Sequence, residues 1–307
     1  MQGVLEGFAV IGAVIALGYL LGHLGVLDLA AQVMLARLSF FVASPALMVT
    51  VLETADVSEV FSKSLAATAG AVVVTGACYL FLARLVWRKE AADTLIGLLS
   101  SVYVNAGNLG LPIAAYVLGD AALVAPVLLM QLLVLQPLAL GALDSTTAAV
   151  PFSLSRIASR AFTNPLTVGT TIGVLLSVTR LQLPDAIHDP LELVGGMAVP
   201  AMLLAYGVSL RLGPLPGSGT TVAEIGCITA LKLVVQPSVA CLIGYFALGL
   251  DGTALLAVTV LAALPTAQNI FVHATRYDRA VIVARDSIFV TTILSVPVLF
   301  VIAALLA

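Results

Sequence analysis

The residues best suited to chemistry are neutral and lie inside an apolar segment, SVYVNAGNLGLPIAAYVLG, at positions 101–119. This segment places Asn105, Asn108, Gly110 and Pro112 within two helical turns. Pro112 has no N–H, so the carbonyl of Asn108 would lose its donor in a helix, and glycines let the backbone leave helical angles. Asparagines three positions apart would share a face. The pattern predicts an interrupted helix whose amides bind a small polar ligand; a kinked helix with asparagines that bond to neighbouring helices is the alternative.

A second segment of the same kind is VLAALPTAQNIFVHATR, at positions 260–276. Pro265 would free the carbonyl four residues earlier, and Thr266, Gln268 and Asn269 add neutral polar groups beside it. Amide and carbonyl oxygens can coordinate a hard cation. The N-terminal end of a resumed half-helix can instead hold an anion through its N–H groups and dipole. The two segments together therefore predict a binding site for a small ion or an organic solute.

Ionisable residues inside apolar stretches are costly in a bilayer and indicate function. Arg37 and Lys232 could attract an anionic ligand, or they could extend to the membrane interface; Lys232 is the stronger candidate because it lies deeper in its stretch. His273 could carry a coupling proton, although a hydrogen-bonded structural role is the stronger interpretation. Asp286 follows Arg285 directly and predicts an ion pair.

The sequence contains no motif for catalysis. No Gly-Lys pair is present, which excludes a P-loop, and no HExxH zinc-protease motif occurs. The three histidines lie far apart in the chain. We therefore predict that the protein is not an enzyme and holds no resident metal or cofactor, with Na⁺ and H⁺ left open as coupling ions.

The composition predicts a membrane protein. Hydrophobic residues make up 61% of the 307 positions and charged residues only 9%, whereas soluble domains carry about 25% charged residues. Lys and Arg total 13 against 16 acidic residues, for a net charge of −3. Such a chain has no positive field for nucleic acid, so we expect the lipid bilayer to be its main environment.

Apolar runs of about 20 residues, the length that spans a bilayer, predict ten transmembrane helices. Their approximate ranges are 4–26, 29–52, 62–86, 91–118, 120–142, 165–184, 189–211, 221–248, 252–275 and 280–306. With the N-terminus outside, nine cationic residues fall in the inner connections: Arg84, Arg88, Lys89, Arg156, Arg160, Arg211, Arg276, Arg279 and Arg285. Only two fall in the outer ones. The positive-inside rule then predicts both termini outside and a cytoplasmic 143–164 segment, in the plasma (inner) membrane.

The polar 143–164 segment separates two halves, 1–142 and 165–307, of five predicted helices each. Weak matches relate them at shifts of 155 to 160 residues, as with Pro137 and Pro297. Five helices per half imply opposite orientations in the membrane. Inverted repeats with a pair of interrupted helices are typical of secondary transporters. A channel or a sensor of the same architecture is the alternative.

Four segments carry a family resemblance: FVASPALM, NAGNLGLP, ALKLVVQP and ALPTAQNIFVHATRYD. They resemble the auxin efflux carrier family, over nearly the whole chain, and the short central segment is similar to that of prokaryotic members. The resemblance implies a fold similar to bile acid:sodium symporters, with the fourth and ninth helices crossing at their breaks. It places Asn105, Pro112 and Pro265 at the crossing, with Ser44 facing it. Tyr206 is a further candidate for the cavity border, although packing is its commoner role.

The same resemblance implies a scaffold of the first, second, sixth and seventh helices, against which the other six move as an elevator. We therefore expect a secondary active or facilitative transporter of small organic anions, either carboxylates such as malate and malonate or auxin-like acids. A sodium-coupled symporter of the bile-acid type is the alternative. The sequence leaves the oligomeric state open, with a homodimer through the scaffold helices as one candidate.

Overall fold

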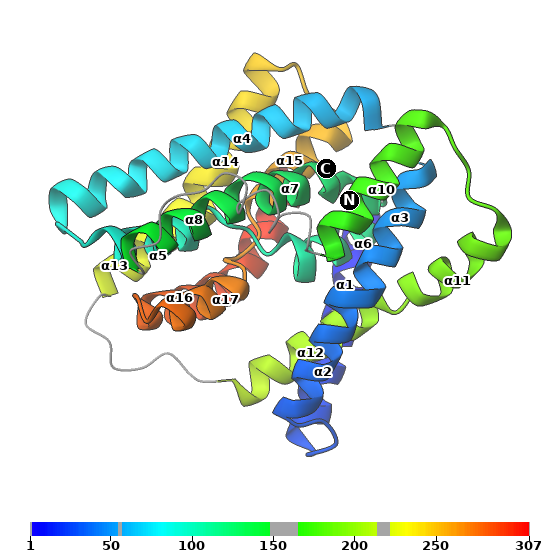
Figure 1. Cartoon of the computed structure of the whole chain (residues 1–307), viewed down its shortest axis with the longest axis horizontal. Helices are drawn as coiled ribbons and strands as arrows, with labels where there is room; N and C mark the ends of the chain where they lie inside the picture. The colour runs from blue at the N-terminus through cyan, green and yellow to red at the C-terminus, as the bar shows by residue number, and fades with distance from the viewer. Residues whose placement is uncertain (1, 55–56, 148–164, 214–221, 307) are drawn as a thin grey trace. The chain divides into compact units, whose positions relative to one another are not determined.

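The computed structural model describes residues 2–54, 57–147, 165–213 and 222–306, and these fold into helices (Figure 1). The described residues contain no β-strand beyond a single isolated antiparallel bridge. Helix is the expected outcome for such apolar segments, because backbone groups in lipid must be satisfied within the segment itself. The prediction of an all-α fold is confirmed for the described residues.

The chain divides into two compact units, each assembled from separate parts of the sequence. Unit 1 comprises Met1–Ser62, Gly107–Leu129 and Phe162–Pro214, and unit 2 comprises Lys63–Ala106, Met130–Ala161 and Leu215–Ala307.

The helices of unit 1 pack closely through small residues. They are α1 (Gln2–His23), α2 (Leu29–Leu38), η1 (Ser39–Ala43), α3 (Ser44–Thr54), α6 (Leu111–Tyr116), η4 (Ala121–Val124), α7 (Ala125–Leu129), α10 (Pro165–Thr179), α11 (Asp185–Gly195) and α12 (Ala198–Leu212). In Figure 1, α1 runs beside α12 and α3 beside α10. A Cβ at Gly207 would lie 2.1 Å from the carbonyl oxygen of Ile15, and one at Gly169 would lie 2.5 Å from that of Pro45. Both helix pairs therefore approach backbone to backbone, as small residues allow in membrane interiors.

Unit 2 contains the two longest helices and the interruptions of both broken helices. Its elements are α4 (Val57–Phe81, which begins in the last residues of unit 1), η2 (Leu82–Val86), α5 (Ala91–Val102), η5 (Met130–Leu135), α8 (Gln136–Thr147), α13 (Val222–Ala230), η6 (Leu231–Val235), α14 (Gln236–Leu242), η7 (Ile243–Ala247), α15 (Gly252–Ala262), α16 (Asn269–Tyr277) and α17 (Val281–Leu306). One core cluster joins α5, α8, α16 and α17 through side chains such as Ile96, Leu143 and Ile270. The short π-turn η3 (Ala106–Gly110) spans the boundary between the units.

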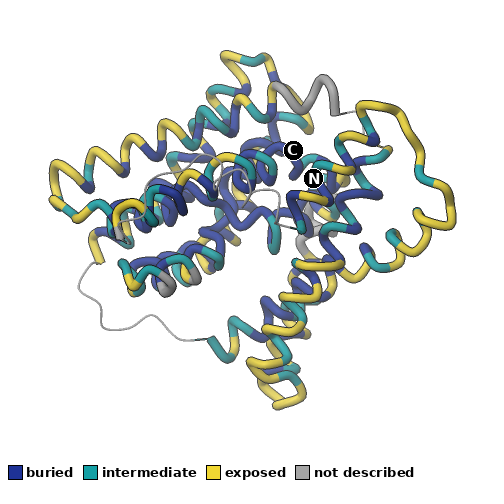
Figure 2. Tube along the Cα trace, in the orientation of Figure 1, coloured by how far each residue is buried: buried dark blue, intermediate teal, exposed yellow. Residues whose placement is uncertain are grey.

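Six helical segments among the described residues are long and apolar enough to cross a membrane: Leu29–Thr54, Lys63–Val86, Ala121–Thr146, Asp185–Leu212, Val222–Ala247 and Val281–Leu306. Four shorter apolar helices accompany them: Ala9–His23, Ala91–Val102, Pro165–Thr179 and Gly252–Ala262. Large apolar side chains stay exposed on the outer faces, such as Val73 and Phe81 of α4, where exposed and buried positions alternate in Figure 2. Lipid is the natural cover for such faces. Ten spans arranged as an inverted repeat remain a prediction.

The central segment differs from its predicted bounds at one end. The predicted linker 143–164 begins inside α8, which continues to Thr147. Positions 148–164 lie outside the described residues. Residues 107–129 pack with unit 1, whereas the resemblance groups them with the moving helices.

Candidate ligand-binding site

The helix that begins at α5 is interrupted at Tyr103–Asn105. The N–H of Tyr103 still donates to the carbonyl of Leu99, but Tyr103 itself adopts extended angles, with φ of −84° and ψ of 106°. The sequence Val102-Tyr103-Val104 explains this position, because β-branched and aromatic residues favour extended backbone. The helix resumes in the π-turn Ala106–Gly110 and continues as α6.

The interruption at Tyr103–Asn105 therefore lies before Asn108–Pro112, where the sequence predicted it. Pro112 lies at the first turn of α6, where a missing N–H is tolerated, and not in the extended stretch. Asn105 belongs to that stretch and Asn108 to the π-turn. The prediction that these two asparagines share a helical face was wrong, because Asn105 is not part of a helix.

The second interruption lies where the sequence predicted it. Helix α15 ends at Ala262, Pro265 falls inside the gap, and α16 begins at Asn269. Pro265 cannot donate a backbone hydrogen bond, so the helix cannot continue through it without loss.

The two extended stretches cross and pair with each other within unit 2. Val104 and Thr266 form an antiparallel bridge. The N–H of Asn105 donates to the carbonyl of Pro265 at 2.8 Å, and the N–H of Ala267 donates to the carbonyl of Tyr103 at 3.1 Å. This ladder supplies the partners that both helices give up, which non-helical backbone at membrane depth requires. We call this pairing of Tyr103–Asn105 with Pro265–Ala267 the crossover.

Polar side chains from neighbouring helices complete the hydrogen bonds of the crossover. Gln131 donates through Nε2 to the carbonyl of Val104, and Gln236 donates through Nε2 to that of Val102, each at 3.1 Å. Thr266 donates its hydroxyl to the carbonyl of Ser100 at 2.6 Å. The N–H of Thr266 donates to the hydroxyl oxygen of Thr291 at 3.1 Å. Thr266 therefore positions the crossover through both of its donors.

A second polar group lies where α16 begins. Tyr103 donates its hydroxyl to Gln136 Oε1 at 2.9 Å, and Asn269 Nδ2 reaches the same oxygen at 3.4 Å. Asn269 and Gln268 are half-buried at the N-terminal end of α16. The N–H groups of Ile270 and Phe271 at this helix end donate to the carbonyls of Ala267 and Gln268, each at 3.1 Å, and the positive end of the helix dipole favours an anion here.

Lys232 is fully buried in the π-turn η6. Its Nζ donates to Gln236 Oε1 at 3.0 Å, and Gln236 in turn holds the carbonyl of Val102. One glutamine thus connects the ammonium group to the crossover. The side chain is thus fully buried among protein atoms and does not lie on an outer face. No Asp or Glu of the described ranges forms an ion pair with Lys232.

Glu224, a second buried charged residue of unit 2, is neutralised by an ion pair and contrasts with Lys232. Glu224 is 2% exposed, accepts a hydrogen bond from the hydroxyl of Tyr79 at 2.7 Å and forms an ion pair with Lys89 at 2.5 Å. Glu224 therefore has a cation of its own, and Lys232 has only a neutral amide. A buried cation balanced by neutral groups alone can receive an anion.

The remaining charged candidates are Asp286, His273 and Arg37. Asp286 is buried and accepts from Arg285 Nε at 2.7 Å, so the predicted ion pair is confirmed. His273 is half-buried on α16. Arg37 is exposed on α2, among the apolar side chains of unit 1.

The predicted site residues are divided between the two units. Unit 2 holds Asn105, Pro265, Thr266, Gln268, Asn269, Lys232, His273 and Asp286. Unit 1 holds Ser44, Asn108, Gly110, Pro112, Tyr206 and Arg37. Within unit 1, Ser44 and Tyr206 are buried on α3 and α12, and α12 contacts both α3 and α6. The structure brings the first interruption, Pro265 and Thr266 together directly, and it connects Lys232 to them through Gln236.

Sequence reasoning missed the role of Gln236. Its signal was present in the segment ALKLVVQP, where this glutamine follows Lys232 by four residues, one turn of an α-helix, and precedes a proline. Gln131 and Gln136 carry no comparable local signal, because their partners are set by packing between helices.

Comparison with known proteins gives consistent results. A family model described as "Membrane transport protein" matches residues 4–143 and 146–303. A protein of Rhizobium meliloti (strain 1021) named "Putative malonate transporter" is 28% identical over 266 residues, covering 83% of this chain and 81% of that protein. An "Uncharacterized transporter" of Methanothermobacter thermautotrophicus is 30% identical over 285 residues, covering 92% of this chain and 91% of that protein.

Proposed function

Because the chain belongs to the auxin efflux carrier family of membrane transport proteins, we propose that it carries small organic anions across the membrane by alternating access. The observation that carries this proposal is the crossover with a buried lysine beside it. Two interrupted helices that meet at their breaks are the usual transporter site. Lys232, with no carboxylate partner in the described ranges, supplies the positive charge that attracts an anion.

We propose that Asn105 and the N-terminal end of α16 bind the substrate carboxylate. Asn105 is 3% exposed, and its backbone N–H donates to the carbonyl of Pro265, so the residue is positioned at the crossover. The half-buried Gln268 and Asn269 extend the site along the start of α16. Ser44, Asn108 and Tyr206 of unit 1 remain candidate ligand-binding residues on the ground of the family resemblance and the sequence pattern alone.

Malonate is the first substrate to test. The name of the Rhizobium relative suggests it, and a short dicarboxylate suits a site with one buried ammonium and one helix N-terminus. Malate and auxin-like aromatic acids are the competitors. Neutral amide and carbonyl oxygens at the crossover are also suitable for Na⁺, so a sodium-coupled symporter is the second candidate.

We propose the elevator movement that the family resemblance implies, and the scaffold helices that it names fall in one compact unit. The helices assigned to the scaffold, α1, α2–α3, α10 and α11–α12, all belong to unit 1, together with residues 107–129. We further propose a plasma-membrane location with both termini outside, and a homodimer through unit 1.

The test is counterflow in proteoliposomes that contain the purified full chain. Liposomes loaded with unlabelled malonate should accumulate labelled malonate from outside, saturably, and unlabelled carboxylates should compete. Omitting Na⁺ and imposing a pH gradient in separate reactions identifies the coupling ion. Unitary currents, or flux without stimulation by internal substrate, would identify a channel and overturn the proposal.

A further inference from the structure

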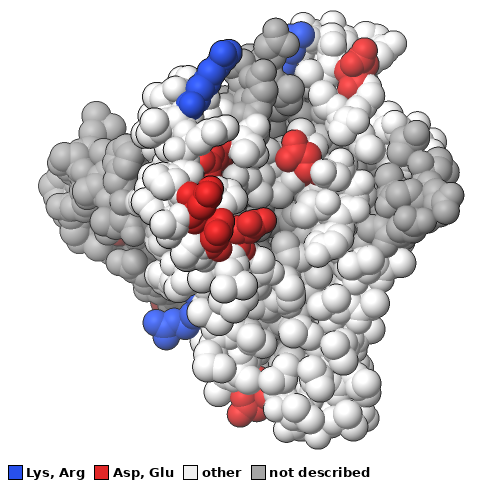
Figure 3. All heavy atoms as spheres, turned by 90° about the vertical axis from the view of Figure 1, so that its right-hand side faces the viewer, with Lys and Arg blue, Asp and Glu red and all other residues white. Residues whose placement is uncertain are grey.

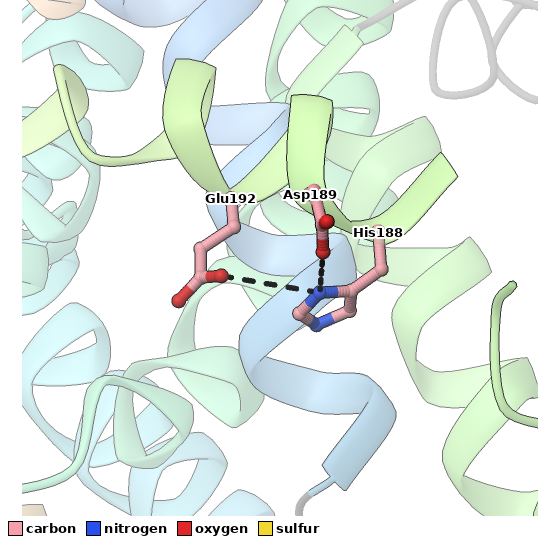
Figure 4. Close-up of side chains that lie close together, drawn as sticks. All are labelled: His188, Asp189 and Glu192. Carbon is pink, nitrogen blue, oxygen red and sulfur yellow. Dashed lines mark ion pairs between the residues drawn. The ribbon is translucent and has the colours of Figure 1, made fainter. Parts of the chain in front are cut away.

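A cluster of one histidine and three carboxylates lies in unit 1 and uses none of the predicted site residues. His188, Asp189 and Glu192 belong to the first turns of α11, and Glu53 lies at the end of α3, which packs against α11. Figure 4 shows both acidic side chains of α11 directed at the imidazole of His188. Acidic side chains also gather on the face that Figure 3 shows, the side of the molecule on which α11 lies.

The three side chains of α11 have the spacing of metal ligands. His188 Nδ1 lies 3.8 Å from Asp189 Oδ1 and 4.0 Å from Glu192 Oε2, and the three ligand atoms lie within 4.8 Å of one another. Two ligand atoms on one tetrahedral zinc ion are about 3.3 Å apart, given metal–ligand distances of about 2.0–2.1 Å. Asp189 and Glu192 are 75% and 71% exposed, so small rotations of free side chains can close this difference.

Glu53 provides independent support, because it is a buried carboxylate with an unused oxygen. Its side chain is 3% exposed, and Oε1 accepts the backbone N–H of Leu183. Oε2 has no hydrogen-bond partner and lies 3.8 Å from His188 Nε2. Histidines that bind a metal through one nitrogen usually donate the other N–H to a carboxylate, which fixes the ring and raises its basicity. Glu53 is placed for that role.

The charge of the cluster also favours a cation. Three carboxylates surround one imidazole, and no Lys or Arg in the described parts of the chain forms an ion pair with any of them. A hard cation such as Ca²⁺ prefers oxygen ligands alone, whereas an imidazole favours zinc and related transition metals.

We propose that this cluster binds a divalent transition metal such as Zn²⁺. His188 Nδ1 and the carboxylates of Asp189 and Glu192 are the ligands, water completes the coordination, and Glu53 accepts the N–H of His188 Nε2. The bound ion fastens the start of α11 to the end of α3 within unit 1. Under the predicted topology this end of unit 1 faces outside, where it would meet external metal.

Zinc binding to the purified full chain in detergent tests this site without any transport measurement. The titration should show one saturable Zn²⁺ per chain. His188→Ala should abolish this binding, and Glu192→Gln should weaken it strongly without affecting folding, because Glu192 is exposed. Glu53→Gln should weaken binding about 10–100-fold, the usual effect of losing a carboxylate partner of a metal-binding histidine.

Two variants serve as controls. Asp185→Asn removes an exposed carboxylate from the same helix, and His23→Ala removes an imidazole that accepts from Arg211 Nε elsewhere in unit 1. Both should bind zinc within twofold of the unmodified protein. Zinc should also raise the thermal unfolding temperature of the unmodified protein but not that of His188→Ala. Absence of saturable binding, equal binding by His188→Ala, or equally tight Ca²⁺ binding would each overturn the proposal.

Discussion

The two interruptions at the crossover differ in how their backbones are satisfied. The stretch Tyr103–Asn105 contains no proline, and glutamines from η5 and α14 cap the carbonyls of Val104 and Val102. The stretch Ala263–Gln268 contains Pro265 and a threonine that bonds back to Ser100. Both interruptions have hydrogen-bond partners on other helices, but only the second also contains a proline that stops its own helix. Substitutions should therefore affect them through different positions.

Asn105→Ala should have the largest effect and abolish saturable malonate counterflow. Alanine keeps the backbone N–H that donates to Pro265, so the crossover should stay paired and only the amide side chain is lost. Counterflow in proteoliposomes, beside the amount of folded protein recovered from the membrane, separates loss of binding from loss of structure. Near-normal counterflow by this variant would remove Asn105 from the proposed site.

Gln236→Leu should have the next largest effect, on stability as well as on transport. The leucine would leave the carbonyl of Val102 and the ammonium of Lys232 without their glutamine. A buried polar group without its partner costs about 1–3 kcal/mol. We expect a lower unfolding temperature in detergent and roughly a tenfold loss of counterflow, which is about 1.4 kcal/mol.

The matched control for this substitution is Gln182→Leu, which changes an exposed glutamine. It should leave unfolding temperature and counterflow nearly unchanged. If both leucine variants behave alike, the carbonyl of Val102 does not depend on Gln236, and the contrast between the two interruptions disappears.

Pro265→Ala should reduce counterflow about fivefold. Alanine adds a backbone N–H donor at position 265, and it removes the proline that stops α15 from continuing. A helix extended through position 265 would withdraw the carbonyl that accepts from Asn105. The fall in rate should come with a higher KM. An unchanged KM would show that the site does not depend on the open form of the second interruption.

The sequence predicted where both helices would be interrupted, to within a few residues. Pro265 gave the second gap its position, because proline acts on its own helix. Pro112 predicted the first interruption too far along the chain. The β-branched and aromatic residues Val102–Val104, which favour extended backbone, mark its actual position. Extended backbone can form in an apolar helix only where other groups accept or donate the hydrogen bonds that the helix loses. Here Gln131 and Gln236 donate to the carbonyls of Val104 and Val102, from 27 and 134 positions away in the sequence.

The sequence singled out Lys232 but did not predict the direction of its side chain. Lys232 was recognisable as a buried cation from its place in an apolar run. Whether its side chain points to the interface or to the crossover depends on the packing of α5 against η6, which no local pattern records. The same holds for Glu224, whose partners Tyr79 and Lys89 come from distant parts of the chain.

Pro112→Ala should have the smallest effect, less than about threefold on counterflow. Pro112 lies at the start of α6, after the chain has already left and re-entered the helix, so alanine there neither closes nor opens the stretch Tyr103–Asn105. Helix starts accept both residues, and alanine favours the helix that is already present. Measured beside Pro265→Ala under identical conditions, this variant tests the comparison directly. A loss as large as that of Pro265→Ala would mean that the start of α6 at Pro112 belongs to the transport site after all.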